Sequence, residues 1–196
     1  LKEKIMKKIF TLASLFALVA FTQNVRAQSE DEMKKWNDYM KPGKMHELMA
    51  SWEGQWTANI SLWMAPGAPP TQSKGTLLNK MDMDGRYQIG RHTGDFNGMP
   101  FEGMSILAYD NAKKVFESTW IDNMGTGIMH LKGEWNDPKK VMTLNGFMTD
   151  PMTGKDSKVK ETFTVVDDNT HVMEMYMEGP DGKEFKTMEI VYKRNN

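Results

Sequence analysis

F-E-S-T-W-I-D-N-M-G-T-G, residues 116–127, is the stretch of the sequence that decides the fold class. Phe116, Ser118 and Trp120 fall on one face of a short strand, because successive side chains of a strand point to opposite sides. Residues 122–125, Asp-Asn-Met-Gly, favour a turn, since Asp and Asn bond to nearby backbone and Gly accepts a positive φ. A second strand begins at once after this turn. The stretch therefore predicts an antiparallel hairpin in the middle of an all-β domain.

Strand-like runs extend from this hairpin in both directions. Turn residues such as Asp84-Gly85 and Asn97-Gly98 separate them, and no helix lies between any two runs. We predict an all-β fold over residues 53–196, an up-and-down antiparallel β-barrel of about ten strands. A sandwich is the alternative, and the barrel is favoured because closure removes exposed strand edges. The runs cover residues 55–63, 73–81, 86–93, 101–109, 114–121, 127–135, 140–147, 157–166, 171–178 and 184–193.

Residues 1–27 have the pattern of a secretory signal peptide. Residues 1–5 lie upstream of the expected start at Met6, which is followed by two lysines, an apolar run and a small-residue cleavage site ending at Ala27. The apolar run, residues 9–21, is shorter than the roughly 20 residues that a membrane-spanning helix needs. An uncleaved anchor is the alternative. We expect an exported protein, periplasmic or secreted, that does not span the membrane.

Removal of the signal peptide changes the charge balance. Residues 1–27 carry five of the 25 Lys and Arg residues but only one of the 26 Asp and Glu residues, so residues 28–196 have a net charge of −5. A mildly acidic chain with scattered charges lacks the basic patch that nucleic acids or anionic membranes attract. The chain has no Cys, which excludes disulfides and lipid attachment to cysteine, so burial must stabilise the fold.

Residues 28–52 predict a short helical segment before the barrel. Ser29 and Glu32 form a capping-box pattern, and apolar residues recur at helical spacing up to Pro42-Gly43, which ends the first helix. A second helix is expected over residues 44–51. We interpret the segment as a lid or plug on one end of the sheet, with a mobile linker as the alternative for residues 28–40.

The chain resembles a known family along most of its mature length. The motifs that carry the resemblance occur in order between residues 41 and 194, and they read HELMASWEGQW (46–56), MAPGAPPTQSKGT (64–76), MDGRY (83–87), GMPFEG (98–103), YDN (109–111), STWIDNMGTG (118–127), DPMTGK (150–155) and EMYMEGPDGKEFKTMEIVYKR (174–194). They are similar to the domain-of-unknown-function family 1579. The resemblance implies a lipocalin-like, calycin-type barrel with an N-terminal helical segment, and it implies no catalytic residues, because the activity of the family is unassigned.

Residue types give no catalytic constellation. The four histidines, His46, His92, His130 and His171, lack the short spacing of a local metal pair, although three strands could still bring the last three together. No Ser lies in a G-x-S-x-G elbow and no Cys exists. We therefore expect no enzyme activity, no cofactor and no metal site.

Methionine is the unusual feature of the composition, with 19 in the chain. Met173, Met175 and Met177 alternate, so they share one face of a strand. Thioethers select Cu(I), but flexible methionines also fill irregular cores and line adaptable pockets, and we favour that interpretation. Such a lining suits a barrel that accepts apolar ligands of variable shape.

Candidate ligand-binding residues follow from the strand pattern. We expect Trp56, Tyr87, Trp120 and Met175 to line the interior, with Glu174 or Arg86 at a polar end of it. Solvent-facing acids are the alternative for Glu174, because an unpaired buried carboxylate is costly. Asp122, beside Trp120, shapes the cavity mouth or caps the central hairpin. Glu161 lies on the opposite face of its strand from its neighbours Thr162 and Thr164.

Two functions of different classes remain. The first is an exported protein that binds a small apolar or amphipathic ligand inside the barrel. The second is a filled barrel without a ligand, a structural or protein-interaction module of the cell envelope. The volume and polarity of the interior distinguish them.

Overall fold

The computed structural model describes residues 29–96, 98–179 and 181–195. The signal-peptide prediction for residues 1–27 lies outside them. The chain divides into two compact units, residues 1–41 and 42–196. In the first unit, residues 29–40 are α-helical, and the side chains of Met33, Trp36 and Met40 are exposed. Within the described part of the chain, no helix combines the length and the apolar character needed to cross a membrane.

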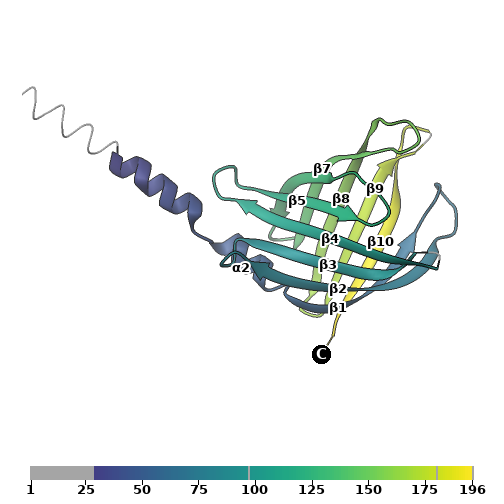
Figure 1. Cartoon of the computed structure of the whole chain (residues 1–196), viewed down its shortest axis with the longest axis horizontal. Helices are drawn as coiled ribbons and strands as arrows, with labels where there is room; N and C mark the ends of the chain where they lie inside the picture. The colour runs from purple at the N-terminus through teal and green to yellow at the C-terminus, as the bar shows by residue number, and fades with distance from the viewer. Residues whose placement is uncertain (1–28, 97, 180, 196) are drawn as a thin grey trace, which may run out of the picture. The chain divides into compact units, whose positions relative to one another are not determined.

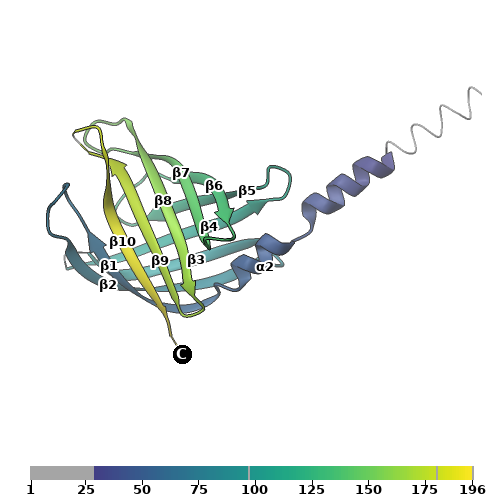
Figure 2. The ribbon, with the colours of Figure 1, turned by 180° about the vertical axis from the view of Figure 1, so that it is seen from behind.

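The second unit is a closed barrel of ten antiparallel strands, so the predicted fold is confirmed (Figures 1 and 2). Each strand pairs with its neighbours in sequence, and β1 pairs with β10 to close the wall. The turn residues therefore connect hairpins throughout, as an up-and-down topology requires. The strands are β1 Gly54–Leu62, β2 Thr71–Asp82, β3 Tyr87–Phe96, β4 Met99–Asp110, β5 Val115–Asp122, β6 Met129–Asn136, β7 Val141–Thr149, β8 Asp156–Asp167, β9 Thr170–Glu178 and β10 Glu184–Arg194.

The strand register assigns each side chain to the interior or to the outer face. Residues directly opposite each other on antiparallel strands share a face. Phe116 is fully buried and lies opposite Tyr109 and Gly133, while Trp120 lies opposite Ser105 and Met129. The central hairpin of the sequence thus turns the side chains of Phe116, Ser118 and Trp120 into the barrel.

Helix α2, Lys44–Ala50, plugs one end of this barrel. His46 holds the start of the helix, because its Nδ1 accepts a hydrogen bond from the Gly43 backbone N–H at 3.1 Å. At the other end of the helix, Gln88 Nε2 donates to the Met49 carbonyl at 2.6 Å. Met49 and Trp52 are buried in the same apolar cluster as Phe116. Helix α2 and the turn after it therefore cover this end of the barrel.

The interior is packed near α2 and less filled away from it. The cluster around Met49 contains buried, inward-facing side chains of five strands. In the half of the barrel remote from α2, inward-facing side chains keep partial exposure to solvent, among them Ile60, Phe101, Trp120, Met129, Met175, Met177 and Met188. Because these side chains point away from the outer surface, their exposure indicates space inside the barrel at this end.

Two glycines allow close approach of the strands along the barrel wall. A Cβ on Gly133 would lie 1.8 Å from the Thr143 carbonyl oxygen, and one on Gly146 would lie 2.1 Å from the His130 carbonyl oxygen. Only a residue without a side chain fits where another backbone comes so near. Both glycines occupy inward-facing positions, Gly133 opposite Leu144 and Gly146 opposite Leu131.

Candidate functional site

The structure brings four of the seven predicted site residues to the interior face of the barrel. Trp56, Trp120, Asp122 and Met175 all occupy inward-facing positions by register. They come from β1, β5 and β9, and their side chains all face the interior of the barrel. The other three residues, Tyr87, Arg86 and Glu174, do not line it.

Trp56 belongs to the packed floor of the interior. Its side chain is 1% exposed, its indole N–H donates to the Trp52 carbonyl at 3.2 Å, and its ring lies 4.3 Å from that of His171. All of its polar and apolar surface is in contact with protein. Trp56 therefore supports the site from below and does not present a free surface to a ligand.

Trp120 and Asp122 lie in the less filled half, and their hydrogen bonds fit the expected alternative that Asp122 caps the hairpin. The Trp120 indole N–H donates to Asp122 Oδ2 at 2.7 Å. Asp122 Oδ1 accepts the backbone N–H groups of Met124 and Gly125 at 2.9 and 3.1 Å, which caps the turn after β5. The ring of Trp120 packs edge-on against that of His92 at 4.8 Å. The pair therefore fixes the end of the hairpin, and a role at a cavity mouth stays a prediction.

The three remaining candidates lie outside the interior. Tyr87 is 37% exposed on the outer face of β3, and Arg86 in the preceding turn donates to the Met83 carbonyl at 3.0 Å. Glu174 faces outward on β9, where its Oε1 accepts from Lys186 Nζ at 2.9 Å. The interpretation of Glu174 as a solvent-side acid is the one that the structure supports. A polar end built from Glu174 or Arg86 is not present.

Besides Asp122, Glu161 on β8 places a carboxylate inside the barrel. It faces inward between Leu144 of β7 and Met175 of β9. Among the described residues, no side chain or backbone group forms a hydrogen bond or ion pair with it. Burial raises the pKa of Glu161 to about 7. Its side chain keeps partial exposure although protein surrounds it, so that exposure is to the space inside the barrel.

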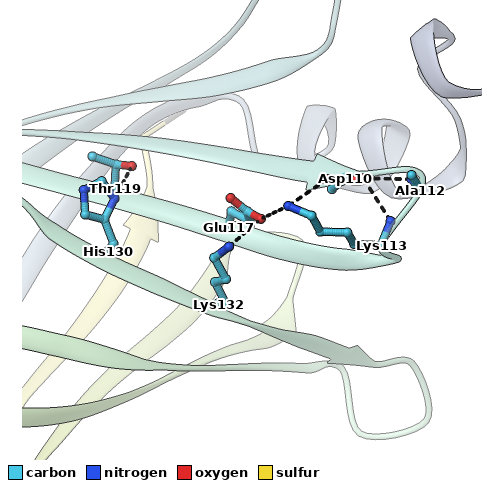
Figure 3. Close-up of polar contacts among 7 residues, drawn as sticks. All are labelled: Asp110, Ala112, Lys113, Glu117, Thr119, His130 and Lys132. Atoms are coloured by element: carbon cyan, nitrogen blue, oxygen red, sulfur yellow. Dashed lines mark hydrogen bonds and ion pairs between the residues drawn. The ribbon is translucent and has the colours of Figure 1, made fainter.

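Glu117, a carboxylate on the outer face, has partners and so differs from Glu161. Glu117 on the outside of β5 accepts hydrogen bonds from Lys113 and Lys132 at 3.3 and 2.9 Å (Figure 3). These bonds hold the pKa of Glu117 below its usual value, the bond from Lys132 contributing most. The hydrogen bonds from the two lysines favour the ionised form of Glu117, whereas burial disfavours the ionised form of Glu161.

Tyr192 of β10 is a further polar group deep in the interior. It lies opposite Ala58 and His171 and is 4% exposed. Burial raises its pKa, and the neighbouring Glu161 carboxylate raises it further. The phenol therefore stays protonated and lies within electrostatic reach of Glu161.

The strand histidines do not converge on a metal. His92 and His171 face inward from β3 and β9, and burial lowers the pKa of each to about 4. His130 lies on the outer face of β6, with Nδ1 3.4 Å from the Thr119 hydroxyl (Figure 3). Within residues 29–96, 98–179 and 181–195, no group of three His, Asp or Glu side chains could hold a metal ion.

The charges that face the interior are mainly negative. By register, the inward positions of the ten strands carry the carboxylates of Glu161 and Asp122 and a single cation, Arg194. The Arg194 guanidinium lies at the plugged end, where it donates to the carbonyls of Ser51 and Asp168, both at 2.9 Å. The guanidinium of Arg194 is therefore hydrogen-bonded to backbone carbonyls and does not neutralise the charge of Glu161.

The end of the barrel opposite α2 has an apolar rim. The connections that follow β1, β3, β5, β7 and β9 meet there, because the topology is up-and-down. Large apolar side chains are exposed at or beside most of these connections, namely Met64, Phe96, Met99, Met124, Ile128 and Met152. An apolar molecule that reaches the less filled half of the interior would pass this rim.

A hollow also lies against β7, β8 and β9. It has a volume of about 390 Å³ and lies over β7, β8 and β9 beside Phe147 and Tyr176. Lys160 there pairs with Glu184 and lies 4.3 Å from the ring centre of Tyr176. Unlike Glu161, these two charged groups therefore have a partner.

The residues that sequence reasoning missed as site candidates are Glu161, Tyr192 and His92. The sequence did carry a signal on β8: Glu161 is two residues from the apolar Val159 and two from Phe163, so the three side chains share one face of the strand. No comparable signal pointed to His92, because its nearest neighbours on the same face of β3 are Gly90 and Gly94 and not apolar side chains.

Comparisons with known proteins show a family and a fold. The family model described as "Protein of unknown function (DUF1579)" matches residues 41–194. The structure of Rv2717c from M. tuberculosis is similar, with a TM-score of 0.57 and 12% identity over 80% of this chain and 100% of that chain. The S-type phycobiliprotein lyase CPES from Guillardia theta has a TM-score of 0.54 and 9% identity over 79% and 94% of the two chains. Both are calycin-like barrels. No curated protein matches the sequence.

Proposed function

Because the chain belongs to the DUF1579 family of proteins of unknown function and folds as a closed calycin-like barrel, we propose that it binds a small apolar or amphipathic molecule inside the barrel. The protein acts in this proposal as an exported binding protein and not as an enzyme. The family and the fold alone do not carry the proposal, since the same fold hosts many functions.

The observation that carries it is the unpartnered Glu161 carboxyl group. Burying an ionisable group without a partner costs free energy, and the protein gains no stability from it. Glu161 nevertheless lies among apolar side chains, between Leu144 and Met175, with Tyr192 as its polar neighbour. An apolar pocket with a few polar groups that orient the bound molecule is typical of small-molecule sites.

The state of the interior argues against a filled structural barrel. Inward-facing Trp120, Met175 and Met188 keep partial exposure in the half remote from α2. A barrel that served only as a scaffold would gain stability by filling this space. The methionines there are unbranched and polarisable, so they can adapt to a ligand. The apolar rim at the same end supports access for such a molecule.

The test is native mass spectrometry of the protein purified from its own host, combined with titration of the polarity-sensitive dye N-phenyl-1-naphthylamine. We expect a co-purifying small molecule, and dye fluorescence that rises on binding. Ser118 faces inward on β5 and Thr119 faces outward beside it. Ser118→Phe fills the interior and should abolish dye binding, whereas Thr119→Phe is the matched control and should not. If neither a co-purifying molecule nor dye binding is found, the proposal is wrong.

Export is tested separately from binding. Expression of the chain from Met6 in a Gram-negative host, followed by fractionation and N-terminal sequencing, should give a periplasmic protein that begins at Gln28. A cytoplasmic protein that retains residues 6–27 would overturn the export proposal and leave the binding proposal standing.

A further inference from the structure

We propose that the interior selects molecules that carry one protonated amine on an apolar body, with Glu161 as the counter-ion. The inference rests on the proposed function and names the ligand class for the same site. It is carried by the charges that face the interior, by the position of Glu161 and by the absence of a protein partner for it among the described residues.

No Lys or Arg side chain of the ten strands is available inside the barrel to pair with Glu161. By register, all lysines of the ten strands lie on the outer face, where several form ion pairs, as Lys186 does with Glu174 and Glu189. Arg194 is bonded to backbone at the plugged end. A ligand with a cationic group could therefore form an ion pair with Glu161 that no side chain of the strands provides.

The apolar surroundings of Glu161 should make the preference for a ligand with a protonated amine headgroup strong. Its neighbours across the strands are Leu144 and Met175, and charge interactions are stronger in such a low-dielectric setting than in water. A protonated amine beside the carboxylate would offset the desolvation that raises the pKa of Glu161 to about 7. The carboxylate of a fatty acid would instead face Glu161 and Asp122, two like charges. The Tyr192 phenol can add a hydrogen bond to a headgroup held at Glu161.

Other titratable groups in the interior do not change this preference near neutral pH. His92 and His171 are neutral there, because burial lowers the pKa of both to about 4. Tyr192 is protonated, Asp122 is bonded to Trp120 and to the turn after β5, and Arg194 remains charged at the plugged end. Glu161 is thus the interior group whose charge changes between about pH 6 and 8.

The experiment compares three ligands of equal chain length but different headgroup. Dodecylamine, dodecanol and dodecanoate are titrated against bound N-phenyl-1-naphthylamine at about pH 8, and we expect dodecylamine to displace the dye at a concentration at least about tenfold lower than dodecanol. Dodecanoate should be the weakest. Glu161→Gln should remove the preference for the amine, while Glu134→Gln, on the exposed outer face of β6, should leave it unchanged.

The outcomes separate this inference from the proposed function. If all three ligands displace the dye equally, or if Glu161→Gln keeps the amine preference, the inference is wrong and interior binding stands. If the dye itself does not bind, the proposed function fails as well. At about pH 5 the amine remains charged but Glu161 is protonated, so the preference should shrink for the native protein. An amine preference that does not change with pH would also overturn the inference.

Discussion

Arg194 lies over the ring of Trp56, with the guanidinium carbon 4.1 Å from the ring centre. The two residues face each other across β10 and β1, the last and first strands, where the barrel closes. The guanidinium also donates to the carbonyls of Glu53, Ser51 and Asp168. One side chain therefore ties the end of the sheet to the turn after α2 and to the β8–β9 turn.

Replacing Arg194 should loosen this closure. Arg194→Met keeps much of the apolar stem but removes the donors, and we expect a loss of about 2 kcal/mol in the free energy of unfolding, since each bond involves a charged donor. Urea unfolding followed by tryptophan fluorescence measures it. Arg91→Met on the outer face of β3 is the matched control and should change stability by less than about 0.5 kcal/mol. Equal effects of the two variants would contradict the role of Arg194.

The hydrogen bonds of Asp122 should stabilise the turn that follows β5 in the central hairpin. Asp122→Ala removes the acceptor for the Trp120 indole and for the turn N–H groups, and we expect it to cost about 1–3 kcal/mol. Asp122→Asn keeps one acceptor oxygen and should cost less. Thermal unfolding compares the two, and Trp120 emission should change in the Ala variant. If Ala and Asn behave alike, the hydrogen bonds do not stabilise the turn.

The fold followed from the sequence because local signals agreed with each other. Period-two alternation and Gly, Asp and Asn turns placed all ten strands within a few residues of their observed ends. On β9, alternation placed the methionines and Glu174 on opposite faces of the strand. It did not say which face is the interior, and the expectation that Glu174 lies at a polar end of the interior was wrong.

The site was harder to predict because inward faces are not uniformly apolar. On β3 the apolar-looking face of Tyr87 and Ile89 points outward, while Gln88, Gly90 and His92 point inward. Gln88 is needed inside to donate to the Met49 carbonyl of the plug. A Cβ on Gly90 would lie 2.4 Å from Ser105 Oγ. These requirements come from elements distant in sequence, so no local pattern reveals them.

Gly133 should tolerate no side chain. Gly133→Ala places a Cβ 1.8 Å from the Thr143 carbonyl oxygen, which is backbone and cannot move without breaking the β6–β7 pairing. We expect a loss of at least about 3 kcal/mol, or failure to fold. Gly127→Ala is the control, because nothing lies within 4 Å of its added Cβ. Soluble yield and far-UV circular dichroism compare the two, and a stable Gly133→Ala protein would contradict the close approach.

Glu161 should make the free protein less stable as the pH rises. The folded state holds the proton of Glu161 up to about pH 7, whereas the unfolded chain releases it near the ordinary value of 4.5. Stability from this group is therefore complete below about pH 4.5 and is lost as the pH rises through 7. Glu161→Gln removes this dependence, so its advantage over the native protein should grow by up to about 3 kcal/mol between about pH 4 and 8. Urea unfolding at a series of pH values measures the difference, in which the histidine contributions cancel. A difference that stays constant with pH would mean that water solvates the Glu161 carboxylate in the folded barrel as well as in the unfolded chain.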